Sequence, residues 1–390
     1  MIRFRLLPWE YAVRNQFRRP LRTMLTLAGL TTVVALVFVV VGFIRGLEKS
    51  LTVSGDPNVA LVFSLGMGEN LEYSSIPMRT VDLIPASIEG VEQRSGNKYV
   101  SPELYLGTQI GCGPEERPPA MGLVRGVTPA ALLVRSGVEI EEGAWPNPGE
   151  VIVGRLAATK LGATADMLAP GRTLRLEGRK WRVSGVFAAR GAAFESEVWC
   201  RLDDLQQAMK RQDLSLVALK LAPGADFSDV SLFCQERLDL ELQAIREADY
   251  YATLTRDYGP VRMLAWLVVL LVSGSGVFAG LNTMYASVIG RIRELAALQT
   301  IGFSRRAIIV SLLQEGVLLA CAASLLATVL AITLINGSAV RFTMGAFALR
   351  IDGVAVLIGC GVGVALGILG AIPPAARALR MSIVDGLRSL

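Results

Sequence analysis

The stretch "RIRELAALQTIGFSRRAIIVSLLQE" (residues 291–315) carries four arginines and two glutamates, yet long apolar runs flank it on both sides. In its first half, apolar side chains recur at every third position, which predicts one apolar face on a short helix. These residues are Ile292, Leu295, Leu298 and Ile301. Gly302 comes next and suits a left-handed helix end, and Ser304 suits the cap of a second helix. We therefore expect a helix, a sharp turn and another helix.

The chain contains apolar runs that are long enough to cross a membrane. An uncharged helix of roughly 20 residues spans the hydrocarbon core. Four runs reach that length: residues 23–44, 263–290, 316–340 and 353–376. The chain is 52% hydrophobic and only 19% charged, with a mean hydropathy of +0.47. Buried helices of a soluble protein are the alternative, but four such runs favour a membrane protein. The last run reaches Pro373-Pro374, where we expect the helix to end.

Arginines beside these runs predict their orientation, because positive charges favour the cytosolic side. They are Arg3, Arg5, Arg14, Arg18, Arg19 and Arg22 before the first run, Arg291, Arg293, Arg305 and Arg306 between the second and third, and Arg377, Arg380 and Arg388 after the fourth. We therefore expect both termini and the 291–306 loop to be cytosolic, and residues 45–259 to lie outside. The first run is too long for a cleaved signal peptide. The segment before it mixes aromatic side chains with arginine and is expected to lie on the cytosolic leaflet.

The expected outer region alternates strand and helix signals. Residues 150–162 indicate a strand followed by a helix, and residues 172–187 indicate a hairpin that turns at Glu177-Gly178. Residues 197–211 indicate a strand and then a helix capped by Asp203 or Asp204, and residues 214–224 indicate a further strand. The Pro/Gly-rich stretch 111–122 is interpreted as a seam between two lobes. Together these signals predict a mixed α+β domain.

The residue types that usually carry catalysis are scarce. The chain has no histidine, which excludes Ser-His-Asp triads, Cys-His dyads and His-ligated zinc. It has no Gly-Lys dipeptide and so no Walker A loop, and no Gly-x-Ser-x-Gly elbow. Ser95 and Lys98 match Ser-x-x-Lys, but they lie among turn residues without the companion motifs, so a plain loop is favoured.

Carboxylates and cysteines give no stronger signal. Glu195 with Glu197, and Asp203 with Asp204, are close pairs that we expect on the solvated surface. The five cysteines form no Cys-x-x-Cys pair. One disulfide among Cys112, Cys200 and Cys234 is left open, and Cys321 and Cys360 are expected to be small packing residues. We expect this chain to hold no catalytic residue, metal ion or cofactor.

Small residues in the apolar runs predict close helix packing. Gly359, Gly363 and Gly367 recur every four residues in the last run, and Gly276 and Gly280 do so in the second. Such spacing lets helix backbones approach each other. The partner helix is either in the same protomer or in a second copy of the chain.

The charged residues of the 291–315 stretch support two interpretations equally well from pattern alone. Arg291 and Glu294 are three residues apart and are expected to pair on the helix surface. Glu315 falls about three turns into the second helix, near the inner interface, where a charge costs less than at the bilayer centre. The stretch is therefore either a connector or a rigid docking element for a cytosolic partner.

A family resemblance favours the docking element. Residues 291–319 resemble the signature segment of the FtsX/MacB-like ABC transporter permeases, in which an Arg-x-x-Glu, a leucine, a hydrophobic-Gly turn and a span-opening Glu follow one another. The matching positions are Arg291 or Arg293 with Glu294, Leu295, Leu298, Ile301, Gly302 and Glu315. Residues 372–390 are similar to the closing segment of the family, although Val384, Asp385 and Gly386 depart from it. Residues 151–162 and 176–187 resemble a MacB-like periplasmic core.

The resemblance implies a permease of a bacterial inner membrane that dimerises and binds separate ATPase subunits. Those subunits, and not this chain, would hold ATP and Mg²⁺. The segment from Arg291 to Arg306, including Glu294, would then sit in a groove of the ATPase, where Leu295, Leu298 and Ile301 anchor it. The arginines of the segment, Arg291, Arg293, Arg305 and Arg306, would meet acidic residues on the rim of the groove. The expected activity is export or extraction of a substrate on the outer side, with mechanical signalling to an outer partner as the alternative. Membrane lipid is an expected partner and nucleic acid is not, and the resemblance leaves a periplasmic adaptor open.

The expected layout is one span before the outer domain and three spans after it. It comprises a cytosolic amphipathic segment (1–22), span one (23–44), the outer α+β domain (45–259), span two (260–290), the coupling loop (291–306), span three (307–335), a short outer loop (336–352), span four (353–374) and a cytosolic tail (375–390).

Overall fold

The computed structural model describes residues 9–18, 20–67, 70–94, 96–114, 116–343 and 345–380, without the side chains of 378–380. It divides into two compact units, which are described separately. The helical unit comprises Met1–Arg45, Pro260–Ser338 and Leu349–Leu390, and the α/β unit comprises Gly46–Gly259 and Ala339–Ala348. Ser95, half of the Ser-x-x-Lys match, lies outside the described residues.

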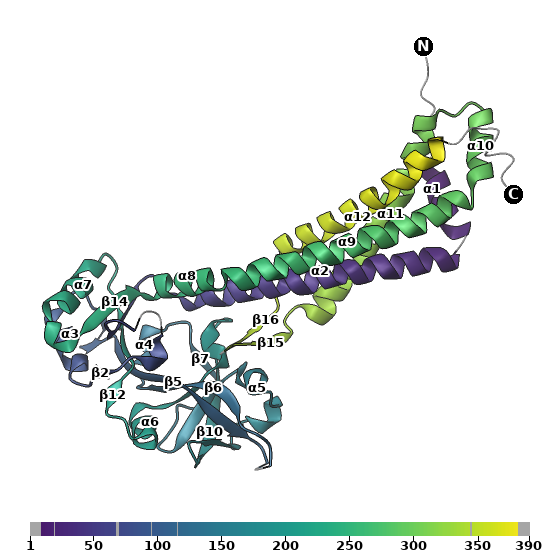
Figure 1. Cartoon of the computed structure of the whole chain (residues 1–390). Coiled ribbons are helices and arrows are strands. Elements are labelled where there is room, and N and C mark those ends of the chain that lie inside the picture. The colour runs from purple at the N-terminus through teal and green to yellow at the C-terminus, as the bar shows by residue number, and fades with distance from the viewer. Residues whose placement is uncertain are drawn as a thin grey trace. The chain divides into compact units, whose positions relative to one another are not determined.

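The helical unit is built on four long apolar helices, each long and apolar enough to cross a membrane (Figure 1). They are α2 (Pro20–Ser54), α9 (Gly259–Ile289), α11 (Arg305–Leu330), which continues as a π-helical turn (Ala331–Ile335), and α12 (Gly353–Arg380). Two short helices accompany them, α1 (Trp9–Arg18) and α10 (Ile292–Thr300). The four apolar runs predicted from sequence form helices, apart from residue 290 of the second run and residues 336–340 of the third, and α2 extends well beyond residue 44.

The prediction that the last helix ends at Pro373-Pro374 is wrong. Helix α12 runs through both prolines to Arg380. Proline costs a helix about 3 kcal/mol because it removes an N–H and presses on the carbonyl four residues earlier. Ala371 and Ala375 on either side are fully buried, so packing against neighbouring helices keeps this segment helical.

The predicted packing glycines all face helices of the same chain. A Cβ added at Gly276 would lie 2.9 Å from a Val33 methyl, and one at Gly280 would lie 3.8 Å from the Gly370 Cα. On α12, a Cβ at Gly359 would lie 2.5 Å from the Phe38 ring. A Cβ at Gly363 would overlap the Ser324 hydroxyl, and one at Gly367 would lie 2.5 Å from the Ala320 Cβ. These neighbours all lie within one protomer, and contact with a second copy of the chain stays a prediction.

A leucine at Gly363 is therefore expected to destabilise the protomer itself. The added side chain overlaps Ser324 and Val34, and overpacking of this kind costs about 1–3 kcal/mol or more. Gly361→Leu is the matched control, because nothing lies within 4 Å of a Cβ at Gly361. Thermal unfolding in detergent should show a lower midpoint for Gly363→Leu only. Equal midpoints accompanied by loss of dimer would instead place Gly363 at a subunit interface.

The α/β unit is organised around a ten-stranded sheet in the order β14-β1-β13-β5-β6-β11-β8-β10-β7, with β9 bridging β10 and β5. Its strands are β1 (Val59–Ser64), β5 (Val100–Cys112), β6 (Ala120–Val127), β7 (Glu139–Gly143), β8 (Glu150–Gly154), β9 (Thr173–Leu176), β10 (Arg179–Ala188), β11 (Val198–Arg201), β13 (Leu216–Lys220) and β14 (Leu242–Arg246). Pairs β6/β11 and β8/β10 are parallel and the others antiparallel. Because β9 pairs with both β10 and β5, strands β5, β6, β11, β8, β10 and β9 close into a ring.

Short elements cover and connect this sheet. The small strand pairs are β2 (Ile76–Pro77) with β12 (Asp213–Leu214), and β3 (Gln93–Arg94) with β4 (Asn97–Lys98). The α-helices are α3 (Thr80–Ser87), α4 (Ala131–Val134), α5 (Ala157–Lys160), α6 (Leu202–Met209), α7 (Phe227–Glu236) and α8 (Glu247–Asp257). The 3-10 turns are Leu71–Tyr73, Ala165–Met167, Ala193–Ser196 and Leu238–Leu240. The core lies on both faces of the sheet, with Trp199 and Phe187 among its fully buried side chains.

Local strand and helix predictions in this unit are confirmed, with two corrections. The hairpin turns at Glu177 and Gly178, both with positive φ, between β9 and β10. The stretch 111–122 is not a seam, because it joins β5 to β6 within one continuous sheet. Asp203 and Asp204 do not cap α6; they lie in its first turn, and the cap position is Arg201. All five cysteines lie in described residues and are free.

The segment predicted as a short outer loop forms a hairpin of the α/β unit, β15 (Ala339–Phe342) with β16 (Gly345–Ala348). Ala346 and Phe347 on β16 are buried. The Lys160 ammonium group donates a hydrogen bond of 2.6 Å to the Thr343 carbonyl. The connection between α11 and α12 is therefore part of the folded domain.

Candidate functional site

The turn after α10 has the geometry that the sequence predicts. Gly302 has a φ of +98°, which is a left-handed conformation that glycine adopts without strain. The Gly302 N–H donates to the Gln299 carbonyl and the Phe303 N–H to the Leu298 carbonyl, both at 3.1 Å. These two bonds form a Schellman motif, which satisfies the carbonyls at the helix end. The Ser304 hydroxyl then accepts a bond from the Ala307 N–H at 3.2 Å and caps α11, as predicted.

The apolar stripe of α10 does not face outward as a whole. Leu295 is buried, and Leu298 is partly buried against the same cluster of Val288, Ile308, Leu312 and Ala375. Ile301, at the end of the stripe, is 75% exposed. Leu295 and Leu298 thus hold α10 onto α9, α11 and α12.

The charged residues of this segment divide into a buried set and an exposed set. Arg291 and Glu315 are buried, whereas Arg293, Glu294, Arg305 and Arg306 are exposed, as is the uncharged Gly302. Ile301, Gly302, Arg305 and Arg306 lie at the turn between α10 and α11 and are exposed there, whereas Arg293 and Glu294 lie in the first turn of α10.

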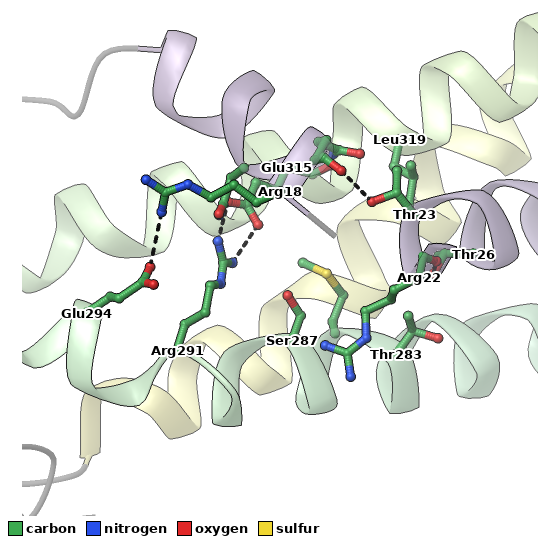
Figure 2. A pocket seen from close by; sticks show the side chains of 13 residues that line it. Arg18, Arg22, Thr23, Thr26, Thr283, Ser287, Arg291, Glu294, Glu315 and Leu319 are labelled. Carbon is green, nitrogen blue, oxygen red and sulfur yellow. Dashed lines mark hydrogen bonds and ion pairs between the residues drawn. The ribbon is translucent and has the colours of Figure 1, made fainter. Parts of the chain in front are cut away.

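Arg291 and Glu315 form a buried ion pair inside the helical unit (Figure 2). The guanidinium Nη1 and Nη2 donate to the two carboxylate oxygens at 3.1 and 2.7 Å. Both side chains are less than a tenth exposed. The predicted pairing of Arg291 with Glu294 is therefore wrong: Glu294 lies 3.6 Å from Arg18 in an exposed pair. Water screens the attraction between Arg291 and Glu315 less than it screens an exposed pair.

Helix α1 supplies partners that the sequence pattern did not reveal. The Asn15 side-chain amide donates to the Glu315 carboxylate, and the Gln16 side chain donates to the Glu315 carbonyl at 2.9 Å. The Thr23 hydroxyl donates to the Gln16 carbonyl at 2.7 Å. Their only sequence signal is that Asn15-Gln16 interrupts the arginines before the first span.

These side-chain bonds connect α1, the start of α10 and α11 to one another. The Arg291 side chain precedes α10, Glu315 lies on α11, and Asn15 and Gln16 lie on α1. Glu315 on α11 is therefore bonded both to Arg291, at the start of α10, and to α1.

The α/β unit holds a second buried charge cluster, and it corrects another prediction. Glu195 and Glu197 are buried and not on the solvated surface. Arg125 donates two bonds to Glu197, at 2.8 and 2.7 Å, and one to Glu103 at 2.6 Å. Arg135 bonds Glu103 and lies 3.2 Å from Glu247. Three carboxylates thus share two guanidinium groups away from water.

The surplus carboxylate of this cluster titrates near neutrality. Burial raises the pKa of Glu247 to about 7, although Arg135 and the Asp56 N–H oppose the shift. A carboxylic acid whose pKa is higher in the folded than in the unfolded state keeps its proton while the unfolded chain releases it. The free energy of unfolding should therefore fall as pH rises from about 4.5 to about 7.

Glu247→Gln is expected to remove this fall, because the amide does not titrate. Above pH 7 its thermal midpoint should exceed that of the unaltered chain by a few degrees. Thermal unfolding of the full chain in detergent from pH 5 to 8 measures this difference. Glu142→Gln is the control, since Glu142 is exposed. If the stability of Glu247→Gln still decreases as pH rises over this range, the decrease would belong to another titrating group.

Within the described residues, no group of three or more His, Cys, Asp or Glu side chains is arranged to hold a metal ion.

Comparisons with known proteins match both units. The family model described as the MacB-like periplasmic core domain matches residues 23–231, more than half of the chain. The model described as the FtsX-like permease C-terminal domain matches residues 266–383. No curated protein matches the chain.

Two solved structures are similar to this chain. One is the periplasmic region of MacB from Actinobacillus actinomycetemcomitans, with 12% identity and a TM-score of 0.40, covering 52% of this chain and 94% of that one. The other is the extracellular domain of the noncanonic ABC-type transporter YknZ from Gram-positive bacteria, with 16% identity and a TM-score of 0.36, covering 48% of this chain and 100% of that one.

Proposed function

Because this chain belongs to the FtsX/MacB-like family of ABC transporter permeases, we propose that its Gly302 turn docks on a separate ATPase subunit. The ATPase subunits close on each other when they bind ATP, and the turn would transmit that movement to the extracytoplasmic α/β domain. Membership gives the chain a permease-type role in a bacterial membrane, with an ATPase partner and dimeric assembly in general. The proposal adds the docking surface, the cytosolic location of both termini, and export or extraction of a substrate as the outcome. ATP and Mg²⁺ would be held by the ATPase.

The observation that carries the proposal is the exposed turn on a rigid support. Ile301 is 75% exposed at a helix end, beside the exposed Arg305 and Arg306. Arginine is one of the residue types enriched in interface hot spots, and Ile301 adds an exposed apolar side chain beside these two. The buried pair of Arg291 with Glu315 supports the turn from behind.

Mechanical signalling to an outer partner is the second candidate, and one feature favours it. Helix α2 continues without a break from its apolar span to Ser54 in the α/β unit. A continuous helix transmits a displacement along its axis without a solute pathway. Stimulation of ATPase activity by a candidate substrate separates export from signalling.

Ile301→Asp is expected to weaken binding of the ATPase at least about tenfold, the effect of losing a hot-spot contact. Because Ile301 is exposed, the thermal midpoint and membrane insertion should not change. The measurement is affinity purification from native membranes in mild detergent, with mass spectrometry of co-purifying chains that carry a Walker A motif.

Leu238→Asp serves as the control, since Leu238 is 79% exposed on the α/β unit. Unchanged recovery of an ATPase with both Ile301→Asp and the double change Arg305→Glu/Arg306→Glu would refute the docking surface. If no ATPase co-purifies with the unaltered chain, even after crosslinking, the proposal that the chain binds a separate ATPase would be refuted.

A further inference from the structure

A cavity of about 90 Å³, lined by both charged or polar and apolar groups, lies in the helical unit beside the Arg291–Glu315 pair (Figure 2). Its walls come from the start of α2, the end of α9 and the third and fourth turns of α11, including Arg22, Thr26, Ser287, Arg291 and Leu319. The cavity therefore lies at the end of the apolar spans where α1 and α10 also lie. A water molecule needs roughly 10–15 Å³ by this measure, so the cavity has room for a group of several polar atoms.

Two guanidinium nitrogens in this wall have hydrogen-bonding capacity left over. Arg22 Nη1 and Arg291 Nε are buried and find no partner among the described residues. Arg291 is only 7% exposed, so water outside the protein does not solvate that nitrogen. A buried donor without an acceptor costs about 1–3 kcal/mol, and more for a charged group. Both nitrogens are donors only, so the missing partner is an acceptor.

The net charge of the side chains that line the cavity favours a negatively charged ligand. Its acidic residues are already engaged, Glu315 by Arg291 and Glu294 by Arg18. Arg22 is the remaining charge, so these groups sum to +1. Ser287 adds a hydroxyl from α9 to the lining that also contains Arg22 (Figure 2). Guanidinium groups and a hydroxyl are typical ligands of a phosphate group.

The surface next to the cavity favours a phosphate that is carried by a lipid. Leu21, Met24 and Leu25 stand beside Arg22 in the first turns of α2 and are 66–73% exposed. These side chains are apolar, and the helix that carries them is one of the four membrane spans. Basic pockets between spans at a membrane surface bind the headgroups of anionic lipids.

We propose that this cavity binds the phosphate group of an anionic phospholipid, with Arg22 and Arg291 as hydrogen-bond donors and Leu21, Met24 and Leu25 against its acyl chains. The bound lipid would link α2, α9 and α11 at the level of α10. The inference rests on the cavity alone and is independent of docking to an ATPase.

The test is native mass spectrometry of the delipidated full chain titrated with three probes. They are dioctanoyl phosphatidylglycerol, dioctanoyl phosphatidylcholine and inorganic phosphate. The unaltered chain should retain phosphatidylglycerol more strongly than phosphatidylcholine. Arg22→Gln should weaken that binding about tenfold or more, the effect of losing a charge-assisted hydrogen bond. Ser287→Val should weaken it independently, because it fills the cavity and removes the hydroxyl. Arg14→Gln is the matched control, since Arg14 is exposed and does not line the cavity.

The probes distinguish the two sources of phosphate. Competition by inorganic phosphate at similar concentration would support the phosphate site but assign it to a soluble ligand. Equal phosphatidylglycerol binding by the unaltered chain, Arg22→Gln and Ser287→Val, each eluting as a folded monodisperse protein, would overturn the proposal. The proposal would also be overturned if Arg14→Gln weakened phosphatidylglycerol binding as much as Arg22→Gln does. Lipid affinity would then depend on the net charge of the protein and not on the cavity.

Discussion

Arg125→Met is expected to destabilise the α/β unit by roughly 3–5 kcal/mol, the effect of leaving buried charges without a partner. Arg125 bonds both Glu103 and Glu197, and these carboxylates are 0% and 2% exposed. Burial alone would raise the pKa of Glu103, yet Arg135 and Arg125 hold it below its ordinary value. The Arg125 guanidinium group also stacks 4.1 Å from the centre of the Tyr105 ring, so methionine loses that contact as well.

Hydrogen exchange of the full chain measures this effect at the place where it arises. Peptides covering β6 and β11 should exchange far faster in Arg125→Met, because those strands pair with each other, β6 carries Arg125, and Glu197 directly precedes β11. Arg182→Met is the control, since Arg182 is 67% exposed and lies 4.0 Å from Glu150; an exposed pair contributes about 0–1 kcal/mol. Adding Glu197→Gln to Arg125→Met should recover part of the loss. Protection equal to that of the control would show that the cluster tolerates an unpaired carboxylate.

Arg291→Met is expected to lower the thermal midpoint strongly and to abolish stimulation of the ATPase together. The change leaves Glu315 buried with Asn15 as its remaining side-chain partner among the described residues. Breaking one side of a buried pair costs about 3–5 kcal/mol. Because the pair joins α10 to α11, its loss should also loosen the turn at Gly302.

The double change Arg291→Met/Glu315→Leu separates stability from coupling. Replacing a buried ion pair by apolar side chains is often neutral or stabilising, so the thermal midpoint should return toward that of the unaltered chain. ATPase stimulation should stay low, because the bidentate link and the bond from Asn15 are both gone. Arg14→Met, on the exposed face of α1, controls for the loss of a positive charge. Full coupling in the double variant would show that the pair only stabilises the fold.

The features that sequence predicted correctly are those set by neighbouring residues. The apolar runs fix the four helices because length and composition alone meet the requirement of a span. Gly302 and Ser304 fix the turn because a Schellman end and a cap depend on a few adjacent residues. The one-plus-three arrangement around a large domain follows from the same local signals.

The missed features all depend on partners that are distant in sequence. Glu315 pairs with Arg291, 24 residues away, and with Asn15, 300 residues away. Glu197 was expected on the surface because its partner Arg125, 72 residues away, gives no pattern near it. The helix through Pro373 is likewise held by contacts with other helices. Local preference is outweighed where tertiary packing contributes several kcal/mol.

The β15–β16 hairpin makes the α/β unit a structure of two separate chain segments. Residues 46–259 form most of it, but the hairpin arrives from between the third and fourth spans. A soluble fragment that ends at Gly259 would lack the Thr343 carbonyl bonded by Lys160 and the Phe342 ring that lies 5.3 Å from Tyr258. Such a fragment would be an incomplete domain, and a synthetic peptide spanning 339–348 should complement it. Conversely, cleavage on both sides of residues 46–259 would not by itself shed the domain, because the membrane-bound part would still hold it through the hairpin.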